Sequence, residues 1–108
     1  MAWSIAFYGS VVESSIRDMP EAFVANYLRL ADAMLEFGPN LGMPHTRAIG
    51  GGLFELRLRG REGIGRVFYC TAAGRRIVML YSFIKKTEQT PLHDLRIART
   101  RLLEVRKS

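Results

Sequence analysis

Several common features are scarce or missing in this chain. Its one cysteine, Cys70, cannot form an internal disulfide bond and leaves no basis for a multi-cysteine metal site. No apolar run approaches the roughly 18 residues that a membrane-spanning helix needs. The first residues, Met1-Ala2-Trp3-Ser4, lack the basic segment that opens a signal peptide. These absences predict a cytoplasmic protein with no membrane partner.

Histidines are few, and no phosphate-binding loop motif is found. His45 and His93 are the only histidines and no acidic cluster accompanies them, which argues against a bound metal. The run Gly50-Gly51-Gly52 precedes a predicted strand rather than a helix, so it does not fit a P-loop. We therefore expect no metal and no small-molecule cofactor.

Positive charge is abundant, and it is concentrated in one block. The 108 residues suit one domain spanning 1–108, with a net charge of +6. Residues 53–86 hold eight basic and two acidic residues, whereas residues 1–52 have a net charge of −2. Arginine outnumbers lysine by 13 to three, and arginine makes planar, multi-donor contacts with phosphate. A basic, β-rich block predicts a polyanionic partner.

The first half of the chain predicts one strand and two helices. Residues 3–8 alternate in the manner of a strand. A capping box at Ser10 to Glu13 predicts a short helix, and a second helix follows with Pro20 in its first turn and its end at Phe37. The second helix has an apolar face formed by Phe23, Tyr27, Leu30, Ala31 and Met34. Residues 40–52, which contain Pro44 and the glycine run, predict a loop.

The second half predicts three strands and a helix. Strands are expected at residues 53–59, 65–71 and 76–84, and the last is apolar enough to lie inside the sheet. Thr90 as N-cap and Pro91 at the first position predict a final helix, whose apolar stripe is Leu95, Ala98, Leu102 and Val105. The predicted fold is α+β, a small antiparallel sheet flanked by helices in the order β-α-α-β-β-β-α.

Five short pieces in this order resemble the RelE/HigB-type toxins of bacterial type II toxin–antitoxin systems, above all the phage-derived HigB-like branch. The pieces are Leu41-Gly42-Met43-Pro44-His45, Gly52-Leu53-Phe54-Glu55-Leu56-Arg57, Arg66-Val67-Phe68-Tyr69, Phe83-Ile84-Lys85-Lys86-Thr87, and Thr90-Pro91 before a basic helix. The resemblance implies a RelE-like fold and an endoribonuclease (mRNA interferase) that cleaves mRNA on the ribosome and so inhibits translation. It also implies a helix-turn-helix antitoxin as partner.

Metal-free RNA cleavage has three chemical needs, and basic residues can meet two of them. The 2′-hydroxyl must lose a proton, the phosphorane needs positive charge, and the leaving 5′-oxygen needs a proton. Arg57 and Arg66, which match arginines of the resemblance, are the expected phosphate clamps. Lys85 or Lys86 is the expected proton donor, if neighbouring cations lower its pKa.

Further residues are candidates for binding RNA outside the cleavage step. Base stacking is a possible role for Tyr69, and phosphate contact for four arginines, Arg59, Arg61, Arg75 and Arg76. Each has an alternative explanation. The turn arginines serve solubility, Arg57 and Arg59 form the solvated face of an amphipathic strand, and Tyr69 packs in the core.

Arg66 shares its strand face with apolar residues, so a structural ion pair with Glu55 is a second reading of it. Neither His45 nor His93 falls on the predicted strand surface. Two other functions also stay open. One is a catalytically degenerate toxin-like module that acts with its antitoxin in transcriptional autoregulation, and the other is a plain nucleic-acid-binding domain.

Overall fold

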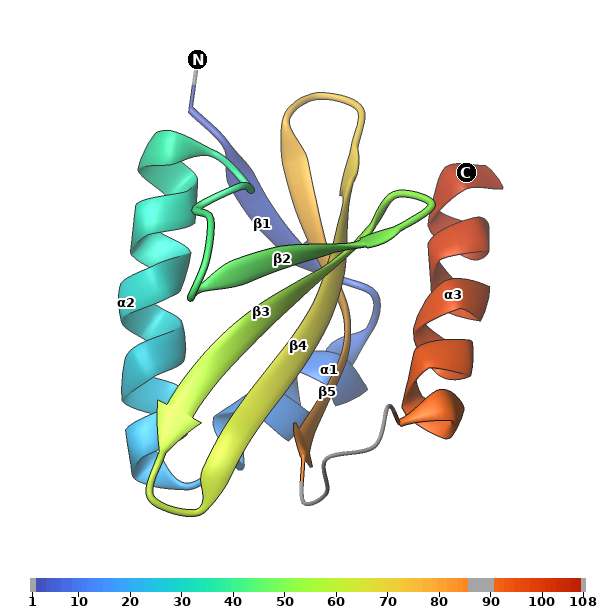
Figure 1. Ribbon diagram of the computed structural model, residues 1–108. Coiled ribbons are helices and arrows are strands. Elements are labelled where there is room, and N and C mark those ends of the chain that lie inside the picture. The colour runs from blue at the N-terminus through green and yellow to red at the C-terminus, as the bar shows by residue number, and fades with distance from the viewer. Residues whose placement is uncertain (1, 86–90, 108) are drawn as a thin grey trace.

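The computed structural model describes residues 2–85 and 91–107, and Figure 1 shows helices packed around a twisted sheet. The elements are, in chain order, β1 (Ser4–Phe7), α1 (Ser10–Arg17), α2 (Glu21–Phe37), β2 (Thr46–Gly50), β3 (Leu53–Gly60), β4 (Gly63–Ala72), β5 (Arg76–Lys85) and α3 (Leu92–Lys107). The α+β class predicted from the sequence is confirmed.

The sheet has five strands in the order β1-β5-β4-β3-β2. Neighbouring strands are antiparallel except β1, which pairs with β5 in parallel. The sheet is therefore larger than predicted, and it is mixed rather than antiparallel. β1 can run parallel to β5 because most of the chain, including two helices, separates the two strands, and a parallel pair needs such a long connection.

The strand β2 corrects the predicted loop over residues 40–52. Residues 46–50 pair with β3, and the observed order is β-α-α-β-β-β-β-α. The glycine run forms the tight β2–β3 connection, where Gly50, Gly51 and Gly52 all have positive φ angles. Positive φ is a conformation that glycine adopts without steric cost, so the run ends a strand instead of marking a long loop.

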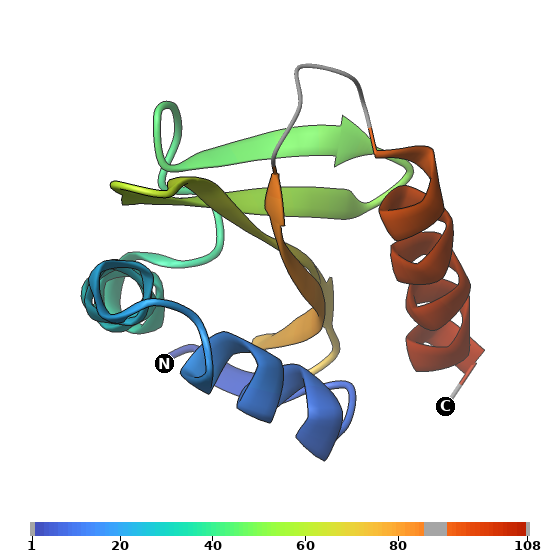
Figure 2. The same ribbon diagram turned by 90° about the horizontal axis from the view of Figure 1, so that it is seen from below.

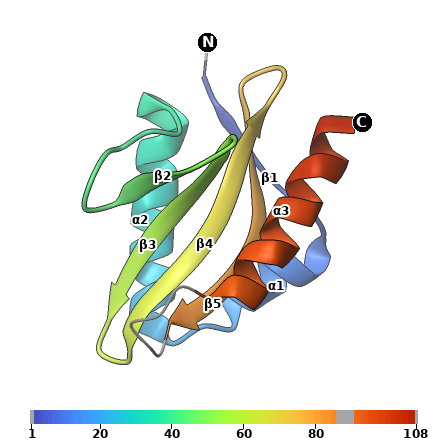
Figure 3. The same ribbon diagram turned by 45° about the vertical axis from the view of Figure 1, so that its right-hand side comes forward.

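Helices cover both faces of the sheet, as Figure 2 shows. On one face, α1 and α2 pack against alternate residues of the strands, such as Leu56, Val67 and Met79. The predicted apolar face of α2 is buried there in full: Phe23, Tyr27, Leu30, Ala31 and Met34. On the other face α3 packs against β4 and β5 (Figure 3) through Ala98 and Leu102, with Leu95 and Val105 at the margins. Both predicted stripes are confirmed.

The helix starts differ from the sequence prediction. Gly9, not Ser10, is the N-cap of α1, and no side chain caps the helix. Glu13, instead of reaching back to Ser10, forms an ion pair of 3.1 Å with Arg17. Pro20 stands at the N-cap of α2 rather than in its first turn. The end of α2 at Phe37 is confirmed, and Gly38 follows with a φ of 97°.

The last helix is fastened to the sheet by Arg101. Its Nη1 donates to the carbonyl oxygen of Leu80 at 2.7 Å, and its guanidinium lies 4.9 Å from the ring centre of Tyr8 and 5.6 Å from that of Tyr81. The predicted N-cap Thr90 lies outside the described residues. Within the described part of the chain, no helix is long and apolar enough to cross a membrane.

Candidate active site

The strand registers bring most of the predicted catalytic residues to one face of the sheet. Arg57 of β3 lies opposite Arg66 of β4, and Arg66 lies opposite Phe83 of β5. One step along, Ile64 of β4 lies opposite Lys85 at the end of β5. Side chains alternate between the two faces of a strand, and this set faces the side that α3 covers in part. The cationic group therefore forms where the first turn of α3 borders the sheet.

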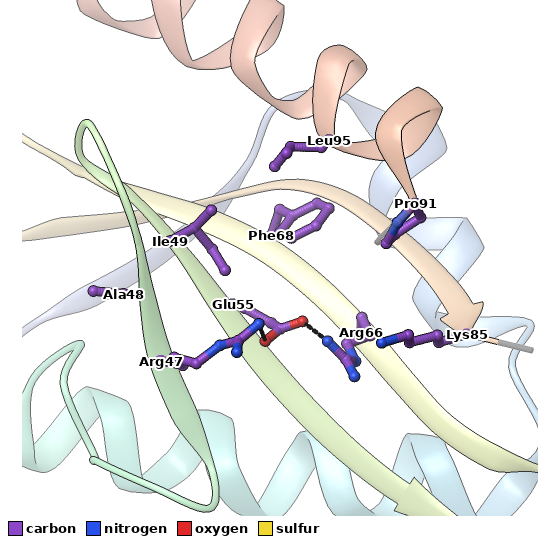
Figure 4. Close-up of a pocket in the computed structure, with 9 residues that line it drawn as sticks. All are labelled: Arg47, Ala48, Ile49, Glu55, Arg66, Phe68, Lys85, Pro91 and Leu95. Atoms are coloured by element: carbon purple, nitrogen blue, oxygen red, sulfur yellow. Dashed lines mark hydrogen bonds and ion pairs between the residues drawn. The ribbon is translucent and has the colours of Figure 1, made fainter. Parts of the chain in front are cut away.

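Glu55 is the acidic centre of this face. Its carboxylate forms ion pairs with Arg66 of β4 and with Arg47 of β2, whose Nη2 lies 3.2 Å from Oε2, and Figure 4 shows the two guanidinium groups on either side of it. Glu55 is 1% exposed and Arg66 is 6% exposed, whereas the Arg47 side chain is half-exposed. The ion pair between Arg66 and Glu55, one of the two readings from the sequence, is thus present.

A cleft of about 260 Å³ opens beside these three residues. Its charged walls come from four neighbouring strands, β2 to β5, and its apolar walls come from β2, β4 and the start of α3. The lining residues are Arg47, Ala48, Ile49, Glu55, Arg66, Phe68, Lys85, Pro91 and Leu95 (Figure 4). The volume is below the 300 to 1,000 Å³, roughly, of pockets for drug-sized ligands, and it suits a single charged group such as a phosphodiester.

Two buried donor atoms on this face have no hydrogen-bond partner in the described structure. They are Nε of Arg57 and Nε of Arg66. A guanidinium has five N–H donors, so Arg66 can hold Glu55 through Nη1 and still offer other donors to the cleft. Buried polar groups are nearly always paired, and an anion in the cleft, which Arg66 lines, would supply an acceptor for the Nε of Arg66.

The remaining predicted RNA-binding arginines lie at the two ends of the sheet. Arg59 is exposed near the β3–β4 turn, with its backbone N–H bonded to Asn26 Oδ1 at 3.0 Å, and Arg61 is exposed in that turn. In the opposite hairpin, Arg75 places its guanidinium 5.8 Å from the ring centre of Trp3, and Arg76 donates to a turn carbonyl. Only the first pair neighbours the Lys85 end of the cleft, and Lys86 lies outside the described residues.

Tyr69 is on the wrong face for base stacking. Its side chain is fully buried on the α2 side of the sheet, its ring stacks on Phe54 at 5.6 Å, and its hydroxyl donates to the carbonyl oxygen of Pro39 at 2.6 Å. Burial raises the pKa of this hydroxyl to about 12. The core alternative is the one that the structure supports.

Arg47 escaped the sequence reasoning and His45 was placed off the strand surface there, and both belong to the segment that was predicted as loop. Arg47 lies opposite Glu55 in the β2–β3 register. The carbonyl oxygen of His45 accepts a hydrogen bond of 2.8 Å from the backbone N–H of Arg57. The alternation of Thr46-Arg47-Ala48-Ile49 was a signal for this strand, but the adjacent glycine run outweighed it.

The site has the composition of an anion-binding surface. Within residues 2–85 and 91–107, no group of three or more His, Cys, Asp or Glu side chains could hold a metal ion. What the geometry defines is a mixed α+β fold with an arginine-lined cleft between its sheet and its last helix.

The sequence places this fold in a family. Residues 14–103 match the model of the phage derived protein Gp49-like family (DUF891), and the chain belongs to that family, which is RelE-toxin-like. No curated protein matches the chain.

Proposed function

We propose that this protein is the toxin of a type II toxin–antitoxin pair and cleaves mRNA on the ribosome without a metal ion. The observation that carries the proposal is the convergence of Arg57, Arg66 and Lys85 on one face of the sheet beside a cleft of phosphodiester size. Membership of the Gp49-like family supports the toxin class.

In the proposed reaction the 2′-oxygen of one nucleotide attacks the adjacent phosphorus. The bond from phosphorus to the 5′-oxygen breaks, which leaves a 2′,3′-cyclic phosphate and a 5′-hydroxyl. Negative charge grows on the phosphorane oxygens in the transition state, and fixed donors stabilise it best where water is excluded. Arg57 and Arg66 supply that charge, and Lys85 gives a proton to the leaving oxygen.

The proposed partners follow from the same surface and the same family. Ribosome-bound mRNA is the substrate, and a helix-turn-helix antitoxin neutralises the toxin. The arginines at the β3–β4 turn add sequence-independent contacts with phosphate, so binding should weaken steeply with salt. Arg59 and Arg61 are the exposed pair in that position.

Induced expression tests the proposal. The wild type should arrest growth and leave mRNA cut within translated regions, whereas the Arg57→Ala and Lys85→Ala variants should relieve the arrest. Both residues are partly exposed, so these changes spare the core. Arg29→Ala, which removes the same charge from an exposed position on α2, is the matched control and should still arrest growth.

Two outcomes would contradict the proposal. Soluble wild-type protein that causes no arrest would favour the degenerate binding module. Arrest that persists in both cleft variants would show that the active site lies elsewhere.

A further inference from the structure

The cleft residues supply positive charge, but the reaction also needs a group that accepts the 2′-hydroxyl proton. Glu55 is a poor acceptor because two arginines hold its carboxylate and it is 1% exposed. Tyr81, on the same face, is excluded near neutral pH because burial and Asp94 raise its pKa to about 12. His93 lines a different cavity on α3, beside Tyr8.

His45 is the remaining histidine, and its backbone is held next to Arg57. The register of β2 and β3 pairs Arg47 with Glu55 and Thr46 with Leu56. It extends by one more residue pair, because the Arg57 N–H donates to the His45 carbonyl oxygen at 2.8 Å. His45 therefore stands across from Arg57 at the start of β2.

The face that His45 takes follows from its neighbour. Thr46 is 2% exposed and its Oγ1 accepts a hydrogen bond from the Gly42 N–H at 2.8 Å, which directs this side chain inward. Successive residues of a strand point to opposite faces. The imidazole of His45 thus belongs to the face of Arg47 and Arg57, and the residue is partly exposed.

We propose that His45 is the general base of the reaction, an inference that rests on the proposed function. Its unprotonated ring nitrogen takes the proton of the attacking 2′-hydroxyl as the new bond from oxygen to phosphorus forms. The bond to the 5′-oxygen breaks with its electron pair, and Lys85 protonates that oxygen. Imidazole exchanges protons near neutral pH, which suits this role. The substrate is an RNA phosphodiester with a free 2′-hydroxyl.

Substitution of His45 should leave the fold intact. The hydrogen bonds of His45 that anchor the loop use its backbone, the N–H to Gly42 and the carbonyl to Arg57. His45→Gln keeps both bonds and removes only the imidazole ring. His93→Gln is the matched control, because it removes the other imidazole from an exposed position in α3.

The experiment compares ribosome-dependent cleavage by wild type, His45→Gln and His93→Gln across a pH series. The charged groups near His45 are Arg47 on the strand that follows it and Glu55, Arg57 and Arg59 on β3, and all are unchanged in both variants. We expect His45→Gln to lose about 100-fold or more in kcat, to lose the rise of rate toward neutral pH, and to bind ribosomes as the wild type does. Free imidazole should restore part of the rate in His45→Ala.

The outcomes separate the two proposals. Cleavage by His45→Gln with the wild-type rate and pH profile would overturn the assignment of His45 and leave the ribonuclease proposal standing. A slow variant whose pH profile is unchanged, with no rescue by imidazole, would also overturn it, since that pattern indicates a structural effect. A wild type that cuts no RNA on or off the ribosome would overturn both.

Discussion

The buried ion pair between Glu55 and Arg66 makes a quantitative prediction about stability. Removal of one partner from a buried pair costs about 3 to 5 kcal/mol, because it leaves an uncompensated charge in the interior. In Arg66→Met, Glu55 keeps Arg47 at 3.2 Å, but the Arg47 side chain is 53% exposed. An exposed partner recovers only about 0 to 1 kcal/mol, so we expect Arg66→Met to lose about 2 to 5 kcal/mol of unfolding free energy.

A double-mutant cycle measures the pair itself. Glu55→Leu/Arg66→Met replaces the pair by apolar side chains of similar size next to Phe68 and Ile49, and such replacements are often neutral or better. The double variant should therefore unfold within about 1 kcal/mol of the wild type. Because each single variant leaves one buried charge unpaired, the coupling energy should be about 4 kcal/mol or more. Urea unfolding with a constant m-value is the assay.

The exposed ion pair on α1 is the matched control for that cycle. Glu13 and Arg17 lie 3.1 Å apart, with side chains 46% and 72% exposed. Their cycle should give a coupling of about 0.5 kcal/mol or less. If the buried pair gave a coupling as small as the control, the argument that burial strengthens the Glu55 interaction would be refuted.

Three further predictions concern other parts of the fold. Burial raises the pKa of Tyr69 to about 12 from the usual 10.0, so its neutral form stabilises the fold and this contribution is lost as pH rises from 10 toward 12. Tyr69→Phe lacks the ionising hydroxyl, so its unfolding free energy, measured by urea unfolding at each pH, should fall less over that range than that of the wild type. Gly60→Ala should lose about 1 to 3 kcal/mol in urea unfolding, because its Cβ would lie 2.3 Å from the Phe23 ring, whereas Gly9→Ala meets nothing within 4 Å and should change little. Arg101→Ala should lower the melting temperature, because it removes the hydrogen bond that joins α3 to Leu80 of the sheet. A melting temperature equal to that of the wild type would contradict this role of Arg101.

Local patterns in the sequence were sufficient for the helices and for the strands β1, β3, β4 and β5. The apolar stripes of α2 and α3 have the helical period, and β3, β4 and β5 are bounded by glycine-containing turns. Each of these patterns lies within a single helix or strand, so it can be recognised without knowledge of the tertiary contacts. The end of α2 at Phe37 was equally local, because Gly38 and Pro39 follow it directly.

The parts that could not be predicted depend on partners distant in the chain. β2 is five residues long and is held by pairing with β3, so its own sequence carries little signal beside three glycines. The parallel position of β1 depends on β5, more than 65 residues further on. As a result Arg47 and His45 were left in a loop, although strand pairing brings both beside the predicted arginines.

The face assignment of Tyr69 shows a different limit. Alternation already separated it from Arg66 and Phe68, which share the other face of β4. What the alternation could not tell was which face each helix would cover. The packing of α1 and α2 over one face and of α3 over the other leaves the arginines beside a cleft and places Tyr69 in the core.

The presence of the Glu55 carboxylate in this basic site has a physical explanation. Arg57 and Arg66 are directly opposite each other on neighbouring strands, and like charges in that position destabilise a sheet. Glu55 lies one step along on the same face and binds Arg66 and Arg47, so it offsets part of that repulsion while it fixes the direction of the Arg66 guanidinium. A fixed guanidinium stabilises a transition state better than a mobile one, because its dipoles need no reorganisation during the reaction. Glu55 therefore makes the crowded arginines compatible with a stable sheet, at the expense of one unit of the charge that attracts RNA.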